Sequence, residues 1–199
     1  MRSRKEKPRV SVVLLTFNSS KYLPFVFDSL FKQTVIDDIE IIVVDNNSDL
    51  KTKKILRAQK DIILIENEEN TGFAEGNNIG IDRAQGDYVF CLNHDVILKP
   101  NYVEKVVMYM EEHPYIGSAS GAVYKWDFKK KKSLTHLVDT LGFRVRRSRK
   151  IVDAEVLFDE PDEDGGVEVF GVSAAVAIYR KEAVQELIAV SGYFFDPDY

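Results

Sequence analysis

The chain has 199 residues, of which 45% are hydrophobic, and its formal net charge is −5. This length and apolar content suit one globular domain, and the negative charge argues against a nucleic acid as partner. The single cysteine, Cys91, has no partner for a disulfide within the chain, and we expect it to serve packing. No apolar run approaches the roughly 18 residues of a transmembrane helix. Residues 1–8 are basic and polar, so we expect a disordered tail rather than a signal peptide.

Four apolar runs follow one another in the first half of the chain, and each has the length of a strand. Apolar residues fill them with little polar alternation, which is typical of parallel strands covered on both faces. The runs are residues 10–15, 39–44, 62–65 and 88–92.

A helical pattern follows each of the first three runs. We expect Ser19 or Ser20 to cap the first helix and Ser48 to cap the second. A third helix is expected to begin at Gly72 and to end near Gly86. The alternation predicts an α/β fold with a doubly wound, mostly parallel central sheet and helices on both faces.

Polar residues directly follow each predicted strand. The carboxyl ends of parallel strands meet at the edge where open α/β sheets bind ligands. For a nucleotide ligand, the Asp45 carboxylate can accept a hydrogen bond from the ring N–H of uracil or thymine, which cytosine lacks. Thr16 and Asn18 can then border the nucleotide base. The alternative role for Asp45 is capping of the helix near Ser48.

The loop after the third run contains Asn70 and Gly72, which would let the backbone come close to a nucleotide because glycine has no Cβ. A plain turn before a helix explains Gly72 as well. Asn77 lies one turn inside that helix and is expected to face the same ligand. Asn78 beside it fits a solvated helix position equally well.

The fourth run ends in Asn93, His94 and Asp95. We predict Asp95 as a ligand of Mg²⁺ or Mn²⁺, because one carboxylate, two phosphate oxygens and waters suit these cations. The cation would stabilise the charge on a departing nucleoside diphosphate. A polar turn after a strand is the alternative, and His94 is interpreted mainly as a loop residue.

Five motifs stand in a fixed order, at residues 12–18, 43–49, 70–73 with 76–78, 92–96 and 171–180. In this order and spacing they resemble inverting family 2 glycosyltransferases, and within them the rhamnosyltransferase-like, cell-surface-polysaccharide branch. The resemblance implies a single GT-A-like domain over residues 9–199. Its Rossmann-like nucleotide-binding half would span 9–98 and its acceptor half 99–199.

The resemblance also implies an activity: inverting, metal-assisted transfer of a sugar from a UDP- or dTDP-sugar to a glycan or lipid-linked acceptor. Such transfer belongs to polysaccharide or cell-wall biosynthesis. Asp95 is the implied metal ligand, and Gly171 and Ser173 are the implied acceptor side. The implied nucleotide-sugar-binding residues are Thr16, Phe17, Asn18, Asp45, Asn70, Gly72, Phe73, Asn77, Asn93 and His94.

The catalytic base is where the chain departs from the family pattern. Residues 192–199 match the lead-in to the family's acid pair, and the chain ends at Tyr199 before that pair. We therefore expect a truncated chain with the base beyond Tyr199 and little sugar transfer by these 199 residues alone. Asp196 and Asp198 are weaker candidates that an ordinary turn explains. The alternative function is a non-catalytic nucleotide-sugar-binding module, whereas a nucleotidyltransferase is disfavoured because no Gly-rich triphosphate loop follows the first strand.

The segment 125–166 interrupts the resemblance and separates its charges. Basic residues concentrate between 129 and 150, and acidic residues between 153 and 168. One interpretation is a surface that meets anionic lipid or a phosphorylated acceptor, so we expect a cytoplasmic protein with peripheral contact at the inner face of the membrane through 129–150. The other is two solvated stretches that pair with each other.

Overall fold

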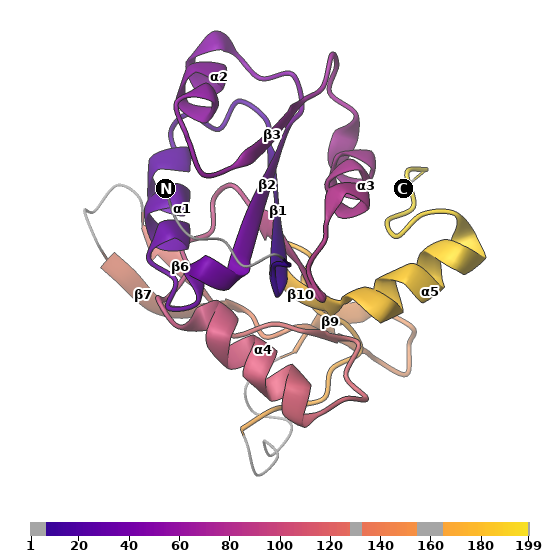
Figure 1. Ribbon diagram of the computed structural model, residues 1–199. Coiled ribbons are helices and arrows are strands. Elements are labelled where there is room, and N and C mark those ends of the chain that lie inside the picture. The colour runs from indigo at the N-terminus through magenta and orange to yellow at the C-terminus, as the bar shows by residue number, and fades with distance from the viewer. Residues whose placement is uncertain (1–6, 128–132, 155–164, 199) are drawn as a thin grey trace.

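The computed structural model describes residues 7–127, 133–154 and 165–198 (Figure 1). Its helices are α1 (Leu23–Phe31), α2 (Leu50–Arg57), α3 (Gly72–Arg83), α4 (Tyr102–Glu112) and α5 (Lys181–Ser191), with a 3-10 turn η1 (Ile36–Asp38). Its strands are β1 (Val10–Thr16), β2 (Ile39–Asp45), β3 (Ile63–Glu66), β4 (Tyr88–Asn93), β5 (Ser118–Ala119), β6 (Val123–Asp127), β7 (Ser133–Thr140), β8 (Phe143–Val145), β9 (Ile151–Asp153) and β10 (Val176–Arg180). None of the helices in this described part has the length and apolar character that a membrane crossing requires.

The central sheet is mixed, with six strands in the order β3-β2-β1-β4-β10-β5. β1 pairs in parallel with β2 and β4, and β2 pairs in parallel with β3. β10 runs antiparallel to β4 and β5. The predicted α/β fold with a mostly parallel central sheet is therefore confirmed. Two small hairpins, β6–β7 and β8–β9, stand outside this sheet.

Helices cover both faces of the sheet, and the period-two alternation of each strand divides its side chains between them (Figure 1). α1, α2 and α4 pack on the face that carries Val12, Ile41 and Phe90. α3 and α5 pack on the face that carries Val13 and Cys91. All residues of β1 and β2 are buried, which is why these strands show no polar alternation in the sequence.

Two local expectations were wrong. β3 is only half-buried, because it lies at the edge of the sheet rather than within it. The predicted serine caps do not form: Tyr22 precedes α1 without a side-chain cap, and Asp49 caps α2 by accepting from the Thr52 N–H at 2.7 Å. The Ser48 hydroxyl instead accepts a hydrogen bond from the Asn18 N–H at 2.9 Å, so it joins two loops.

Two glycines let α3 lie directly on β1 and β2. A Cβ built on Gly80 would stand 2.3 Å from Val13 Cγ1 and 3.2 Å from Val44 Cγ2. A Cβ on Gly76 would stand 2.5 Å from Leu15 Cδ1 and 3.0 Å from the Asn46 amide nitrogen. This close approach fixes the start of α3 against the carboxyl ends of both strands.

Gly80→Ala is expected to lower the free energy of unfolding by about 1–3 kcal/mol, the usual cost of overpacking a core. Alanine regains only about 1 kcal/mol through its better helix propensity. Denaturant titration measures the difference. Gly76→Ala is the matched comparison and is expected to lose less, because Leu15 Cδ1 is the end of a longer side chain. Unchanged stability of Gly80→Ala would contradict this account of the packing.

Candidate functional site

The strand register brings the polar strand ends to one edge of the sheet. Thr16 lies opposite Asp45 in the β1–β2 pair, and Asp45 lies opposite Glu66 in the β2–β3 pair. Leu15, one residue before the end of β1, lies opposite Asn93. The loops after these strands therefore share one edge, as the sequence predicts; we call it the carboxyl edge.

Asp45 is wholly buried at this edge. Its Oδ1 accepts a hydrogen bond from the Thr16 hydroxyl at 3.2 Å, and its Oδ2 accepts one from the Ser48 N–H at 3.3 Å. The bond to Ser48 resembles the alternative capping role, although Asp49 is the residue that caps α2. Each carboxylate oxygen retains acceptor capacity, so the contact to a base stays a prediction.

The loops after β1 and β2 are tied to each other. Asn18 adopts a left-handed conformation with φ 51°, and its side-chain oxygen accepts from the Asp49 N–H at 2.8 Å. Its own N–H donates to Ser48. Phe17, which lies between Thr16 and Asn18 in the chain, is 44% exposed. Hydrogen bonds thus join the two loops, and the partly exposed Phe17 ring lies next to Thr16 in the chain.

Asn46 organises the edge, and sequence reasoning missed it. Its amide nitrogen donates to Asn70 Oδ1 at 3.1 Å and to the Gly72 carbonyl at 2.8 Å. Its oxygen accepts from Asn67 Nδ2 at 2.8 Å and from Thr71 Oγ1 at 3.0 Å. One buried amide therefore holds the whole loop between β3 and α3. The run of polar residues at the end of β2 gave the only signal for this network.

The start of α3 is open. Gly72 has φ 81°, a conformation that favours glycine, and no atom lies within 4 Å of a Cβ built on it. Phe73 is 45% exposed, and its ring meets Phe195 edge-on with the centroids 5.6 Å apart. Asn77 is buried and donates to the Phe73 carbonyl at 2.8 Å, and its contact with a donor stays a prediction.

Asn78 is not the solvated helix position that the sequence also allowed. Its amide donates to the Phe195 carbonyl at 2.7 Å and accepts from the Phe195 N–H at 3.0 Å. This pair of bonds fastens the segment before Asp196 to α3. Asp196 Oδ1 accepts from the Asp198 N–H at 3.0 Å, which is the turn contact foreseen for these residues, and the Asp196 charge raises the pKa of Tyr193. A role of either aspartate as base stays a prediction.

The segment after β4 carries the predicted metal ligand. Asp95 is exposed, and its carboxylate has no hydrogen-bond or ion-pair partner among the described residues. His94 Nδ1 lies 3.4 Å from the Leu15 carbonyl. The described residues contain no group of three or more His, Cys, Asp or Glu that could hold a metal ion. An Mg²⁺ or Mn²⁺ ion fits only as a cation that takes one carboxylate here and completes its shell with phosphate and water.

The predicted acceptor side lies next to this segment. The Asn93 N–H donates to the Ala175 carbonyl at 2.8 Å, and Ser173 lies in the turn just before it, where its carbonyl accepts from Val176. Gly171 is farther out and pairs with Phe143 of β8. The structure thus places Ser173 near Asn93 and Gly171 beside the β8–β9 hairpin.

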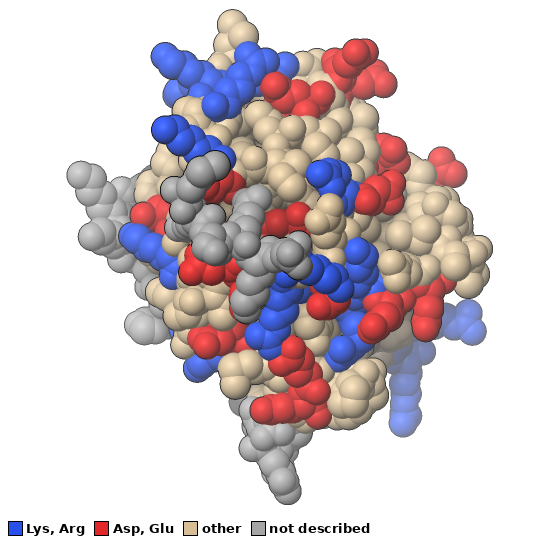
Figure 2. Space-filling view, viewed as in Figure 1, with Lys and Arg blue, Asp and Glu red and all other residues tan. Residues whose placement is uncertain are grey.

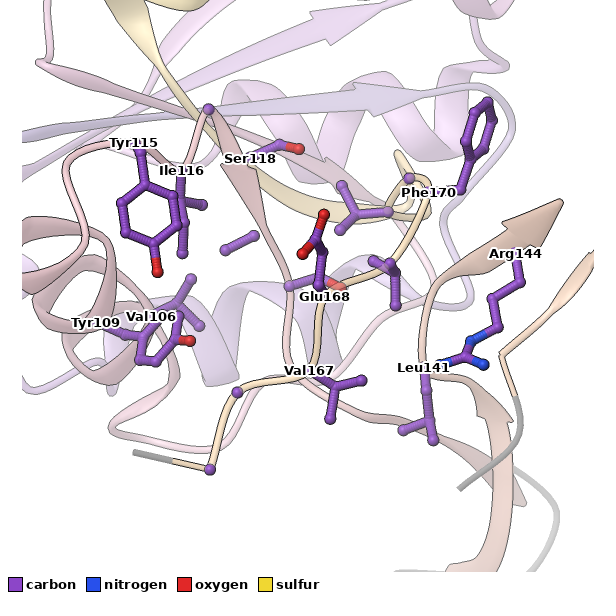
Figure 3. Close-up of a pocket in the computed structure, with 18 of the residues that line it drawn as sticks. Val106, Tyr109, Tyr115, Ile116, Ser118, Leu141, Arg144, Val167, Glu168 and Phe170 are labelled. Atoms are coloured by element: carbon purple, nitrogen blue, oxygen red, sulfur yellow. The ribbon is translucent and has the colours of Figure 1, made fainter. Parts of the chain in front are cut away.

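A separate groove of about 1340 Å³ lies at the β5 side of the sheet. Figure 3 shows Tyr109, Tyr115 and Ile116 on one side of it and Val167 to Phe170 with Arg144 on the other. Gly171 contributes to its wall, and no residue from the carboxyl ends of β1 to β4 does. Among the predicted site residues, only Gly171 belongs to this groove.

Two buried groups, the Cys91 thiol and the Tyr102 hydroxyl, have structural rather than chemical roles. Burial raises the pKa of the Cys91 thiol to about 12, so Cys91 packs as a neutral side chain. Burial likewise raises the pKa of Tyr102 to about 12. The Tyr102 hydroxyl donates to the Val176 carbonyl at 2.8 Å and accepts from the Gly121 N–H at 3.0 Å. Both residues are structural.

The sheet order, the antiparallel β10 and the polar carboxyl edge define an α/β domain of the GT-A type. The model of glycosyl transferase family 2 matches residues 11–188. The chain belongs to this family.

Curated relatives and solved structures agree with this assignment. The chain is 39% identical over 124 residues to an uncharacterized glycosyltransferase of Methanocaldococcus jannaschii, which covers 60% of this chain and 43% of that protein. It is 34% identical over 107 residues to glycosyltransferase GlyG of Streptococcus pneumoniae, covering 52% and 35%. The crystal structure of S. aureus TarS 1-349 in complex with UDP has a TM-score of 0.59 at 18% identity, covering 96% of this chain and 51% of that one. The chain thus spans less than half the length of these curated relatives.

Proposed function

We propose that this domain binds a UDP- or dTDP-sugar at the carboxyl edge and transfers the sugar, with inversion, to a glycan or lipid-linked acceptor. The observation that carries the proposal is the strand register, which brings Thr16, Asp45 and Asn93 to one edge beside the open start of α3. Family membership supports sugar transfer. The structural neighbours support a nucleotide sugar as donor, since TarS is in complex with UDP-GlcNAc and a Pyrobaculum calidifontis mannosyltransferase with GDP-Man and Mn²⁺.

Each part of the edge has a distinct task in this proposal. Asp45 accepts from the base, and the Asn46 network holds the loop that carries Gly72, where the backbone can approach the nucleotide. Asp95 holds a divalent cation against the diphosphate, and that cation supplies charge stabilisation for the leaving group. A carboxylate on the acceptor side would take the proton of the attacking hydroxyl.

Calorimetry with a panel of nucleotides tests the donor class. UDP and dTDP are expected to bind the chain in the presence of Mn²⁺ and to bind more tightly than CDP or ADP. The reason is that uracil and thymine offer a ring N–H to Asp45, whereas the cytosine and adenine rings offer only acceptors at that position. Absence of binding by every nucleotide would refute the proposal, and equal binding of all four would refute base recognition by Asp45.

Asp95→Ala is expected to remove the dependence of UDP affinity on Mn²⁺, while the melting temperature changes little. The carboxylate is exposed and without a described partner, so its loss costs the fold little. Titrations of UDP with Mn²⁺ and with chelator measure the effect. Asp82→Ala, the loss of another exposed aspartate on α3, is the control and should keep the wild-type response. Equal UDP affinity of the wild type with and without metal would contradict the metal role.

A nucleotide-sugar-binding module without turnover is the second candidate. The observation in its favour is that Asp196 Oδ1 accepts from the Asp198 N–H, a contact that an ordinary turn explains without a catalytic role. Incubation of a radiolabelled UDP-sugar with the whole protein and a glycan acceptor distinguishes the two. Transfer of label supports the enzyme, and binding without transfer supports the module.

A further inference from the structure

The β8–β9 hairpin carries a compact basic tip. Its strands pair antiparallel with Val145 opposite Ile151, and the turn closes through the Arg146 N–H bond to the Lys150 carbonyl at 2.9 Å. The Arg149 N–H donates back to the Arg146 carbonyl at 2.8 Å. All five residues from 146 to 150 are exposed. Within the basic stretch noted in the sequence, the structure thus defines one projecting turn, residues 146 to 150.

Four of the five tip residues are cationic, although the chain as a whole carries a net charge of −5. They are Arg146, Arg147, Arg149 and Lys150. Within the described residues none of these side chains forms an ion pair or a hydrogen bond. Figure 2 shows Lys and Arg atoms projecting from the outline below α5, where the β8–β9 turn lies in Figure 1. Within the part of the chain that the structure describes, the tip therefore presents positive charge without a paired carboxylate.

Apolar side chains stand exposed directly behind the charge. Val145 and Ile151 form a cross-strand pair on one face of the hairpin and are 44% and 62% exposed. Phe170, whose N–H donates to the Phe143 carbonyl at 2.8 Å at the other end of the hairpin, is 69% exposed. An exposed apolar pair next to a cationic turn suits a surface that enters a lipid interface.

The backbone of the tip gives an independent observation. Arg149 has φ 62°, in the left-handed region at the turn position where glycine is strongly favoured. An arginine there costs stability relative to glycine. A residue held in this conformation is a candidate for a role outside the fold.

We propose that the β8–β9 hairpin docks the protein on a membrane surface that contains anionic lipids. The four cations meet the lipid phosphates, and Val145 and Ile151 enter the interface behind them. The inference rests on the hairpin alone and not on the carboxyl edge, so it can fail while the proposed function stands. It also agrees with a lipid-linked acceptor.

Nearby acidic groups are few in the described residues. Asp153 ends β9 opposite Phe143, at the end of the hairpin away from the tip, and Glu168 lines the groove beside Arg144. The acidic residues between 155 and 164 lie outside the described residues. Pairing of the basic tip with those acids is the competing interpretation, and it predicts no attraction to a membrane.

Co-sedimentation with vesicles separates these interpretations. The 199-residue chain is expected to bind vesicles of phosphatidylcholine mixed with phosphatidylglycerol, and its affinity should fall as the salt concentration rises. Vesicles of phosphatidylcholine alone should not bind the chain. Arg146→Gln with Arg147→Gln should weaken the partition coefficient by about twenty-five-fold, at about five-fold for each charge. Lys54→Gln with Lys60→Gln makes the same change in charge on and just after α2 and should leave binding unchanged.

Arg149→Gly distinguishes a membrane role from a structural one. It relieves the left-handed conformation and removes one cation, so the melting temperature should hold or rise while vesicle binding falls about five-fold. Ile151→Thr should weaken binding at every salt concentration, because it removes apolar area and no charge. Absence of binding to the mixed vesicles, or equal loss in the Lys54 and Lys60 control, would overturn the proposal.

Discussion

Asp45→Asn is expected to weaken UDP binding by about 1–3 kcal/mol, a reduction in affinity of about 5- to 150-fold. The carboxylate accepts a hydrogen bond from the uracil ring N–H. In the variant, the amide NH₂ group that turns toward the base is itself a donor, so two donors face each other and this hydrogen bond is lost. CDP should lose little or gain, because the cytosine ring nitrogen accepts. The selectivity for UDP over CDP, measured by calorimetry, is thus expected to collapse.

The fold can accommodate this substitution. In the variant, the amide oxygen of the new side chain can still accept from the Ser48 N–H, while its NH₂ group can donate to the Thr16 hydroxyl. That hydroxyl already lies 3.5 Å from the Val44 carbonyl, so it has a second acceptor for its proton. Asp49→Asn is the control, since asparagine caps α2 as well as aspartate does and lies outside the proposed base contact.

The opposite pattern has a different meaning. If Asp45→Asn lowers the melting temperature strongly while the ratio of UDP to CDP affinity stays constant, Asp45 serves the loop at Ser48 and not the base. Another group at the carboxyl edge would then recognise the nucleotide base.

Asn46→Asp is expected to lower the free energy of unfolding by about 3 kcal/mol or more and to abolish measurable UDP binding. The new carboxylate keeps the bonds from Asn67 and Thr71 but turns an acceptor toward the Gly72 carbonyl and Asn70 Oδ1. A buried carboxylate with one oxygen turned toward two acceptors is only partly compensated, which costs several kcal/mol. Loss of these bonds frees the loop that leads into α3, so the backbone at Gly72 no longer holds its place.

Asn47→Asp is the matched control for this change. Asn47 is the next residue, is exposed, and accepts from Lys53 Nζ at 2.8 Å, so a carboxylate there keeps its contact. Its stability should stay within about 0.5 kcal/mol of the wild type, as for most surface substitutions. If both variants unfold at the wild-type denaturant concentration, the Asn46 network is not what holds the loop.

Some of the fold was predictable because it depends on local pattern. β1, β2 and β4 end within one residue of their apolar runs, since each is buried on both faces and the polar residue that follows the run marks the edge. β3 shows the same pattern but lies at the end of the sheet. Strand order is set by pairing between distant segments, and the sequence of a short apolar run does not indicate which strands will lie beside it.

The parts of the site that escaped prediction depend on partners far along the chain. Asn46 bonds to residues 21 to 26 positions away, and Asn78 bonds to Phe195, 117 positions away. Ser48 fits a helix cap by its type, but the fold offers its hydroxyl to the Asn18 N–H instead. In each case the residue type was compatible with a local role, and tertiary contacts decided the real one.

The central claim is that the donor nucleotide binds at the carboxyl edge and not in the groove beyond β5. Backbone amide chemical shifts of the isotope-labelled chain, recorded during titration with UDP and Mg²⁺, test it most directly. The account predicts that residues 16–18, 45–46, 70–73 and 93–95 shift together, with one dissociation constant. Shifts confined to Val106, Tyr115, Phe170 and their neighbours in the groove would contradict it.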